Sequence, residues 1–359
     1  MQRRVTVLVS CALVAISTAA QAQAPGWYAS AEILALTTHG NDVHLGDVIA
    51  ADVTIGGSAP DLTESEVETF SPIAPAMDRT ASFLVEAGHH GTAWGFGGRL
   101  WRVSADASAA DTAMSAAGGP GVVHPTSVRL WNLTFVPAPD IFEPSGLTPI
   151  DYETRNALEH VRAEGYAERA WLQNPALSVV MRFGLAYARS ANTRAERLSM
   201  QSALTLFTLD DALTSSSENT FNLVGPLVGL SGDTAVGRVR LDWLISASAL
   251  VGTAHANGTF DAVETARTNT NEGIVTSTTI TRRSLRTSDD RRALVPALDL
   301  ELKASYGITR AIDIGAGIFT SSLFDLPVAP EFDAQASAWN RRASDIAFLA
   351  YSAFARVKF

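Results

Sequence analysis

Apolar and polar residues alternate strictly along several stretches of this chain, and residues 298–306 show the pattern most clearly. Leucine, alanine and tyrosine occupy the even positions there, while Asp299, Glu301, Lys303 and Ser305 occupy the odd ones. A repeat of two residues is the period of a β-strand and not of a helix. The charged face could meet solvent in a soluble sheet. The interior of a closed barrel explains the charges equally well, and it also explains the unbroken apolar row, which lipid would cover.

Residues 345–359 repeat this alternation at the end of the sequence. Apolar residues fall at Tyr351, Ala353, Ala355, Val357 and Phe359, with Ser352, Arg356 and Lys358 between them. This ending resembles that of bacterial outer-membrane barrels, which commonly finish on such a strand with a C-terminal phenylalanine. The resemblance implies that Tyr351, Val357 and Phe359 form a barrel-closing signal. It also implies outer-membrane lipid and the barrel-assembly machinery as partners.

The first 22 residues have the features of a secretory signal peptide. These are basic residues at Arg3 and Arg4, an apolar run from Val5 to Ile16, and small residues for cleavage at Ala20-Gln21-Ala22. A membrane-spanning helix is the competing interpretation, but the apolar run is shorter than the ~20 residues that a bilayer needs. A lipoprotein cleavage site ending at Cys11 is a further alternative. We expect residues 1–22 to be removed, residues 23–359 to form a single barrel domain, and the chain to lie in a Gram-negative outer membrane.

Composition narrows the fold and the partners further. Beyond the leader no apolar run is long enough for a membrane-spanning helix, so only a sheet that closes on itself could pair its backbone groups in lipid. The formal net charge of the full chain is −10, which argues against nucleic acid as a partner. The single cysteine, Cys11, lies in the leader, so no disulfide is expected in the exported chain.

Ten strand segments can be placed along the chain. They are residues 26–36, 80–90, 93–103, 158–169, 177–189, 221–231, 237–252, 293–306, 311–324 and 345–359. Short links are expected at Gly91-Thr92, Asn174-Pro175, Gly232-Asp233-Thr234 and residues 307–310. Between these pairs, the polar stretches 37–78, 190–219 and 253–292 are expected to be external loops, and the connection after Val103 has room for a short strand.

This arrangement predicts an all-β fold. It is a closed antiparallel transmembrane β-barrel of about 10 strands, with short periplasmic turns and long extracellular loops. A barrel of 12 strands stays open as an alternative, if residues 128–136 and a segment near Leu198 join the ring.

Short glycine-based motifs carry a family resemblance. Phe221, Gly225, Pro226, Gly229 and Leu230 form the pattern F-x-x-x-G-P-x-x-G-L, followed by a hairpin into a strand that ends Leu250-Val251-Gly252. With the opening Gly26-Trp27, the hairpin around Trp94 and the closing strand, they resemble the Legionella-type major outer membrane protein family. The resemblance extends over most of the chain after the leader. It implies an outer-membrane barrel and supplies no catalytic residue, and the first two long connections match no pattern of that family.

Charged residues on the inward rows are the candidate site. The candidate lumen lining is His160, Arg162, Glu164, Arg182, Arg240, Asp242, Asp299, Glu301, Lys303 and Asp313. These side chains either fill the barrel as an ion-pair network or line a selective path. Any pore is expected to be narrow and controlled by the inward charges, because a ten-stranded barrel is only slightly larger than one that side chains fill.

No catalytic, cofactor-binding or metal-binding residue is assigned. The H-E-x-x-H and G-x-S-x-G motifs and a phosphate-cradling glycine loop are absent, so the chain is expected not to be an enzyme and to need no cofactor. His89-His90 lie beside a predicted turn, where a hydrated turn face is the plain interpretation. The stretch 37–78 has eight acidic residues and no Lys or Arg, which makes it a candidate for weak divalent cation binding, against the alternative of a solvated loop.

Two functions follow from this architecture. A narrow porin-like channel for small solutes would need the inward charges to line a continuous wet path. A structural or adhesive surface anchor would act through its long outer loops, without transport. A soluble periplasmic β-rich binding protein is the remaining alternative.

Overall fold

The computed structural model describes fourteen stretches of the chain. They are residues 26–40, 46–56, 63–72, 80–115, 122–123, 126–130, 134–135, 148–173, 177–203, 207–269, 275–327, 331–333, 338–340 and 343–359. The expected signal peptide, residues 1–22, lies outside them. In the part of the chain that is described, no helix is long and apolar enough to cross a membrane.

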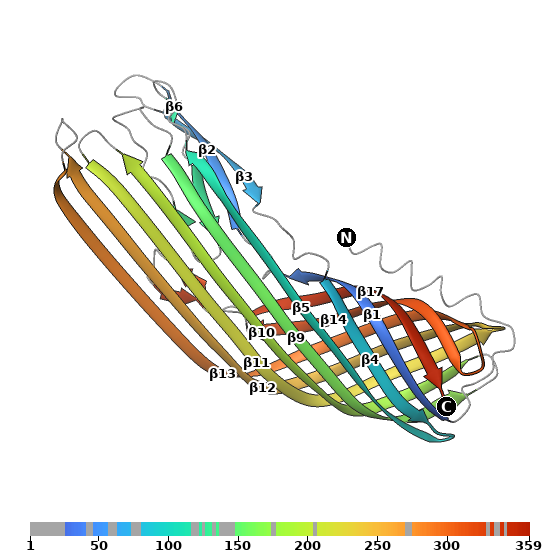
Figure 1. Ribbon diagram of the computed structural model, residues 1–359. Helices are drawn as coiled ribbons and strands as arrows, with labels where there is room; N and C mark the ends of the chain where they lie inside the picture. Colours follow the sequence, from blue (N-terminus) through green and yellow to red (C-terminus); the bar gives the residue numbers. More distant parts are fainter. Residues whose placement is uncertain are drawn as a thin grey trace.

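Ten antiparallel strands close into a barrel (Figure 1). In chain order they are β1 (Gly26–Gly40), β4 (Thr80–His90), β5 (Trp94–Ser115), β9 (Thr148–Gln173), β10 (Ser178–Ala203), β11 (Phe207–Val236), β12 (Val239–Asn269), β13 (Val275–Gly307), β14 (Ile312–Pro327) and β17 (Ala343–Lys358). Each strand pairs with the next of these in the chain, and β17 pairs with β1 to complete the ring. The predicted fold class, a closed antiparallel barrel of ten strands, is confirmed.

The register of the strand pairs fixes the shape of the barrel. Paired residues followed once around the ring from Arg292 on β13 return to the same strand at Ala304, which is a stagger of twelve residues. With spacings of about 4.8 Å between strands and about 3.3 Å between residues, this stagger gives a strand tilt of about 40° and a backbone radius of about 10 Å. Inward side chains fill most of a bore of that radius, so their chemistry decides whether a solute can pass.

Every barrel strand exposes at least one large apolar side chain on its outer face. Examples in chain order are Ile33, Phe83, Leu100, Trp171, Leu185, Val228, Ile245, Leu300, Ile318 and Tyr351. Trp27, Trp94, Trp171 and Tyr306 are exposed near the ends that carry the short turns, where an aromatic girdle would meet a membrane interface. Since so much contiguous apolar surface is unfavourable in water, this belt fits a hydrocarbon environment.

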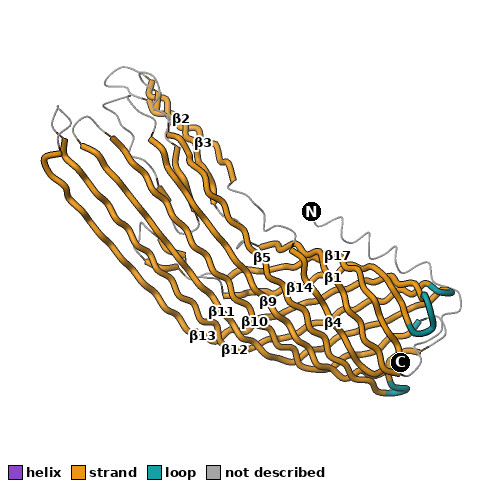
Figure 2. Tube along the Cα trace, in the orientation of Figure 1, coloured by secondary structure: helices purple, strands orange, loops and turns teal. Residues whose placement is uncertain are grey.

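Six neighbouring strands continue far beyond the apolar belt. β5 and β9 to β13 have 22 to 33 residues, whereas β1, β4, β14 and β17 have 11 to 16. The long strands form an open, curved sheet on one side of the barrel mouth (Figures 1 and 2). We call this sheet the wall. It consists of residues 103–115, 148–160, 190–203, 207–222, 253–269 and 275–292.

The wall corrects two predictions. The stretches 190–219 and 253–292 were expected to be loops, and nearly all of their described residues are strand. Outside lipid the outer face of a strand needs no apolar residues, so the two-residue hydrophobic period that marks a strand in the sequence fades there. Ladder hydrogen bonds to long neighbours hold these polar segments in the sheet instead.

The short connections lie at the opposite end of the barrel. β11 and β12 meet at Gly237-Arg238, where Gly237 has a φ of 63°. Glycine at the first central position of a two-residue hairpin is the type II′ arrangement. The predicted turn at Gly232-Asp233-Thr234 is therefore wrong, since these residues pair within the strands and Asp233 lies opposite Asp242. The link predicted at Gly91-Thr92 extends by one residue to Ala93.

A small second sheet lies beside the wall. It contains β2 (Gly46–Gly56), β3 (Thr63–Pro72), β6 (Val122–Val123), β7 (Thr126–Leu130) and β8 (Thr134–Phe135), in the order β3-β2-β7-β8 with β6 beside β2. β7 contacts β5 and β9, which places the sheet at the β5 end of the wall. β15 (Glu331–Asp333) and β16 (Ala338–Asn340) form a separate hairpin.

This sheet also changes the predictions for the first two long connections. Part of the stretch 37–78 is strand rather than loop, because its valine, isoleucine and threonine residues favour a sheet despite the acidic residues between them. The short strand expected after Val103 is confirmed as β7. Since β7 and β8 belong to the small sheet and Leu198 lies within β10, neither segment adds a strand to the ring, and the alternative of twelve barrel strands is wrong.

Candidate functional site

Charged side chains fill the half of the bore that adjoins the short turns. Lys303 contacts both Glu32 and Glu301, and Glu301 is shared with Arg99. These four side chains are between 0% and 7% exposed. An unpaired charge at such a depth is costly, so the groups are tolerated only as a connected set.

A second cluster lies nearer the middle of the bore. Arg162 lies 2.8 Å from Glu164 and 2.7 Å from Asp299. Arg162 also donates to Ser248 at 3.1 Å, and Ser246 donates to Asp299 at 3.2 Å. Because Arg162 belongs to β9 and Asp299 to β13, which are not neighbours in the ring, this ion pair spans the bore.

Arg182 anchors a third cluster close to the turns. Its guanidinium lies 3.3 Å from Glu86 and 2.8 Å from Glu168, and it covers the ring of Tyr166 at 4.4 Å from the centroid. The other carboxylate oxygen of Glu168 lies 3.0 Å from Nδ1 of His90. Glu168 is therefore held by an arginine on one side and by a histidine on the other.

Two further arginines hold the fourth cluster. Arg240 lies 3.1 Å from Asp233 and 2.8 Å from Asp242, and Arg356 lies 3.0 Å from Asp242. Arg356 comes from β17, so this cluster also connects strands that are separated in the ring.

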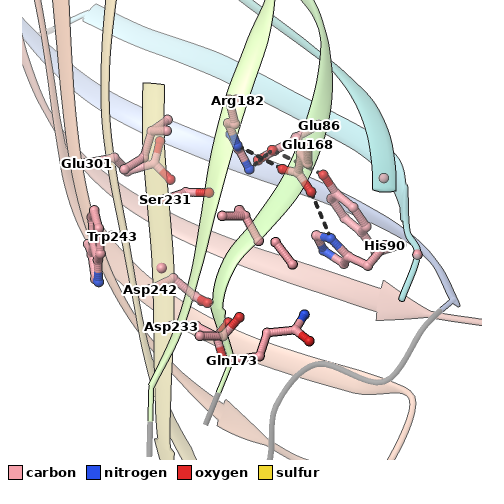
Figure 3. A pocket seen from close by; sticks show the side chains of 18 of the residues that line it. Glu86, His90, Glu168, Gln173, Arg182, Ser231, Asp233, Asp242, Trp243 and Glu301 are labelled. Carbon is pink, nitrogen blue, oxygen red and sulfur yellow. Dashed lines mark hydrogen bonds and ion pairs between the residues drawn. The ribbon is translucent and has the colours of Figure 1, made fainter. Parts of the chain in front are cut away.

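The third and fourth clusters border a cavity of about 80 Å³ (Figure 3). Figure 3 shows Glu168 between Arg182 and His90, with Asp233 and Asp242 lower in the view. The lining includes the turn residues Gly91 and Ala93, so the cavity lies at the turn end of the bore. Five carboxylates and two arginines line it, an imbalance that favours protons and small cations over anions.

Aromatic rings cross the bore beyond the charged half. The ring centroid of Trp101 on β5 lies 5.4 Å from that of Phe319 on β14 and 5.3 Å from that of Phe348 on β17. The ring of His160 on β9 lies 4.8 Å from Trp101 and 5.0 Å from Phe348. β4, β1 and β17 separate β5 from β14 in the ring, so these contacts reach from one side of the bore to the other. We call Trp101, His160, Phe319 and Phe348 the aromatic seal.

Apolar side chains surround the aromatic seal and continue beyond it. Leu34, Leu36, Leu84, Leu250, Val295 and Leu323 are all buried in one cluster with the seal. The guanidinium of Arg99 lies 4.9 Å from the ring of Phe319, which marks the level where the charged half ends. Ions are poorly solvated by apolar surfaces. The aromatic seal and these apolar side chains therefore place an apolar cluster across the bore, next to its charged half.

The distribution of polar groups shows the environment of the sheet. Charged side chains face inward and an apolar belt faces outward, which is the reverse of a soluble barrel. The ring closes, so the strands present no open edge within the belt. The chain is an outer-membrane β-barrel. In such barrels the short turns face the periplasm, so the cavity is periplasmic and the wall is extracellular.

The structure places all ten residues of the candidate lumen lining inside this outer-membrane barrel. Arg162, Glu164, Arg182, Arg240, Asp242, Asp299, Glu301 and Lys303 take part in the ion-pair clusters, and Asp313 pairs with Lys358. His160 differs from them, because it packs among aromatic rings. In the described part of the chain neither of its ring nitrogens has a hydrogen-bond partner. A role of these residues in lining a path for solutes stays a prediction.

About half of the charged and aromatic side chains that fill the bore were not among the candidates from the sequence. The missed residues are Glu32, Glu86, Arg99, Glu168, Asp233 and Arg356 in the charged clusters, and Trp101, Phe319 and Phe348 in the aromatic seal. Their positions in the alternation were a usable signal, since each occupies an inward row. Which of them meet across the bore depends on strand register, and no local pattern encodes register over this distance.

The remaining candidates lie at the periplasmic rim and on the outer face. Tyr351, Val357 and Phe359 point outward, and the backbone amide of Phe359 donates to the carbonyl of Trp27 at 2.9 Å. Their role as a barrel-closing signal stays a prediction. A hydrated turn face is the wrong interpretation for His90, because its ring stacks on Tyr28 at 4.4 Å and contacts Glu168 in the cavity wall.

No metal centre is evident within the described ranges, where no three His, Cys, Asp or Glu side chains form a group that could hold an ion. The stretch 37–78, the candidate for weak divalent cation binding, lies partly outside these ranges. Cation binding there stays a prediction.

Comparison with models of protein families gives no match, and comparison with curated proteins gives none either. Similar solved structures include the outer membrane protease OmpT from Escherichia coli, with 9% identity and a TM-score of 0.41, covering 94% of this chain and 99% of that one. The toluene transporter TodX from P. putida has 11% identity and a TM-score of 0.19, covering 94% and 91%. A FadL homologue from Pseudomonas aeruginosa has 9% identity and a TM-score of 0.20, covering 93% and 90%. At these identities and TM-scores, the activities of these proteins cannot be assigned to this chain.

The comparison corrects one expectation from the sequence. The chain was expected not to be an enzyme, because known catalytic motifs are absent, but a protease is among the structures that it resembles. A fold does not determine whether its members catalyse a reaction, and catalytic residues can occur without a recognisable motif. The exclusion of an enzyme is therefore withdrawn.

Proposed function

We propose that this outer-membrane barrel is closed at rest and serves to hold the extracellular wall at the cell surface. The observation that carries the proposal is the aromatic seal, which joins opposite sides of the bore above the charged clusters. An ion that crossed it would lose its hydration without gaining a polar partner. The ion pairs below the seal also span the bore, so they brace the barrel rather than line an open path.

The length of the wall supports a surface role. On β12 it continues from Thr253 to Asn269, which is roughly 50 Å along the strand at the usual rise per residue. A barrel that only anchored itself or only conducted ions would need no such extension. The outer face of the wall is exposed and polar, so it is available to partners in the medium.

A narrow porin-like channel is the second candidate, and the periplasmic cavity favours it. The cavity admits solvent up to the charged clusters, and its carboxylates would select cations. Conduction then requires the aromatic seal to part. Opening would be intermittent, because each ring of the seal is buried against the others.

Three further assignments belong to this proposal. Residues 1–22 direct export and are cleaved, and barrel-assembly machinery inserts the remaining chain into the lipid of a Gram-negative outer membrane. Membership of the Legionella-type major outer membrane protein family is supported by the motif from Phe221 to Leu230. At Gly225 and Pro226 the pairing of β11 with β12 lapses, which gives this part of the motif a structural reason, since proline lacks an amide hydrogen.

Thiol accessibility tests the closed state directly. Cys11 is the only cysteine of the chain, so a single new cysteine can be followed without background once the leader is removed. Ser231→Cys places a thiol in the periplasmic cavity, and Ser288→Cys places one on the exposed outer face of the wall. The protein is reconstituted in liposomes with the wall outward, and a charged thiol reagent is added outside.

The proposal expects the reagent to modify Ser288→Cys at once and Ser231→Cys only after the liposomes are dissolved. Adding Trp101→Ala should make the cavity thiol reactive from the wall side. Equal reactivity of both thiols in the otherwise unchanged chain would refute the closed state and leave the channel as the function.

A further inference from the structure

The wall ends laterally in a free sheet edge. β14 pairs with β13 only from Ala297 to Gly307. From Val275 to Pro296, β13 therefore has β12 on one side and, among the described strands, no partner on the other. A row of unpaired backbone donors and acceptors is a ready template for another strand.

Arginines are concentrated on this edge. Arg282, Arg283, Arg286, Arg291 and Arg292 lie on the unpaired part of β13, in a chain with a net charge of −10. Arg282, Arg283, Arg286 and Arg292 are exposed, and none of them has an ion-pair partner in the described part of the chain. The acidic residues there are Asp289 and Asp290, and Asp290 is paired with His255. The edge is therefore strongly basic.

A second free edge has the opposite charge. β3 pairs with β2 and with no other described strand. Its sequence, TESEVETFSP, has Glu64, Glu66 and Glu68 at alternate positions and no Lys or Arg. The charges on the two edges are thus complementary in sign.

The two edges lie at opposite ends of the extracellular part. The wall runs in the order β13-β12-β11-β10-β9-β5, and β7 joins the small sheet to β5 and β9 at the far end from β13. Figure 1 shows β13 at one margin of the wall and β2 with β3 beyond the other margin. The edges of one molecule are therefore separated by the width of the wall, while those of two neighbours in the membrane plane can meet.

We propose that β3 of one molecule adds to the free edge of β13 of a second copy, so that the walls of neighbouring barrels join side by side. Charge selects this pairing over the others. Two β13 edges would bring arginine against arginine, and two β3 edges glutamate against glutamate, and like charges directly opposite are unfavourable in a sheet. Of these three contacts, the one between unlike edges places glutamates against arginines while it completes the ladder hydrogen bonds of both strands.

A contact between two different surfaces of the same protein can be repeated from one molecule to the next. Each molecule would still offer one free β3 and one free β13, so the contact produces rings or open rows rather than closed dimers. The inference does not depend on whether the bore is closed.

Cysteine crosslinking in native membranes tests the contact. One chain carries Glu66→Cys, a second and differently tagged chain carries Arg286→Cys, and a short bifunctional maleimide joins thiols that lie close together. The matched control replaces Arg286→Cys with Ser216→Cys, which is exposed on the outer face of the wall at β11, away from both edges. We expect crosslinked pairs of the two tags for the edge positions and only background for the control. Equal yields from edge and control positions would overturn the proposal.

Charge reversal tests the selection by sign. Arg282→Glu with Arg286→Glu should lower the apparent association constant, measured by native mass spectrometry of the protein in nanodiscs, by about tenfold or more. Glu64→Arg with Glu66→Arg should have the same effect. The two altered chains should associate again when mixed, because each then offers an edge that complements the other.

The outcomes separate the proposal from its alternative, in which the arginines only prevent unwanted pairing at an open edge. In that case the unaltered chain stays monomeric at every concentration, and reversal of either set changes nothing or promotes association. Heat-shifted gel mobility of each variant shows that its barrel is folded, so a loss of association cannot come from misfolding.

Discussion

Replacement of Trp101 by alanine probes the aromatic seal. The side chain is 1% exposed, touches Phe319 and Phe348 from across the bore, and touches His160 on the neighbouring strand β9. A buried tryptophan removes about 150–250 Å² from solvent, which corresponds to about 4–6 kcal/mol as an upper bound at ~25 cal/mol per Å². Substitutions of buried aromatic residues by alanine cost about 3–5 kcal/mol. We therefore expect Trp101→Ala to lower the free energy of unfolding by about 3–5 kcal/mol.

Equilibrium unfolding in urea, with the protein in lipid vesicles, measures this cost. Trp171→Ala is the matched control, because Trp171 is 65% exposed on the outer face and its removal leaves no internal cavity. It should cost clearly less. A double-mutant cycle of Trp101→Ala with Phe348→Ala should give a coupling of about 0.5–1.5 kcal/mol. A cost below about 1 kcal/mol for Trp101→Ala, or an equal cost for the control, would refute the packing described for the seal.

Leu300→Arg should cost about 2–4 kcal/mol in the same unfolding assay, because Leu300 faces outward within the apolar belt, and an unchanged free energy would show that this face does not meet lipid. Glu301→Gln should cost about 3 kcal/mol, since it leaves two buried cations without their shared carboxylate. Its counterpart Glu159→Gln, at a pair that is more than half exposed, should change stability by less than about 1 kcal/mol, and equal effects would argue against the buried network. His255, on the exposed outer face of the wall, has its pKa raised by the hydrogen bond to Asp290, so this pair contributes stability at low pH that is lost as the pH rises through the raised pKa. In an NMR titration, the midpoint of His255 should lie above the ordinary value near 6.5, and in Asp290→Asn it should move back toward that value. An unshifted midpoint in the unaltered chain would show that the pair does not form.

The barrel could be predicted from the sequence wherever one face of a strand meets lipid. In residues 298–306 the belt imposes apolar residues on every second position, and the charged row between them identifies the interior. The same rule failed for 253–292, where the outer faces of β12 and β13 leave the lipid and carry polar residues. The turn at Gly237 was misplaced because Gly232-Asp233-Thr234 has turn composition, while the pairing of Asp233 with Asp242 extends the hairpin beyond it.

The candidate site was only half predictable for a different reason. The two-residue alternation assigns Glu301 and Lys303 to the interior. It cannot show that Glu32 completes their cluster, because that contact joins residues far apart in the sequence. The aromatic seal could not be predicted for the same reason. Trp101, Phe319 and Phe348 come together only through the twelve-residue stagger of the closed ring, which is a property of all ten strands at once.

Planar bilayer recording of the purified, refolded protein measures most directly whether the bore is closed. The aromatic seal predicts no steady current for the unaltered chain, with at most brief openings of small conductance. Trp101→Ala with Phe348→Ala should conduct, and because the charged clusters then border the path, the current should prefer cations and lose that preference as salt screens the charges. Large, steady currents from the unaltered chain that do not change when the seal is removed would contradict the account.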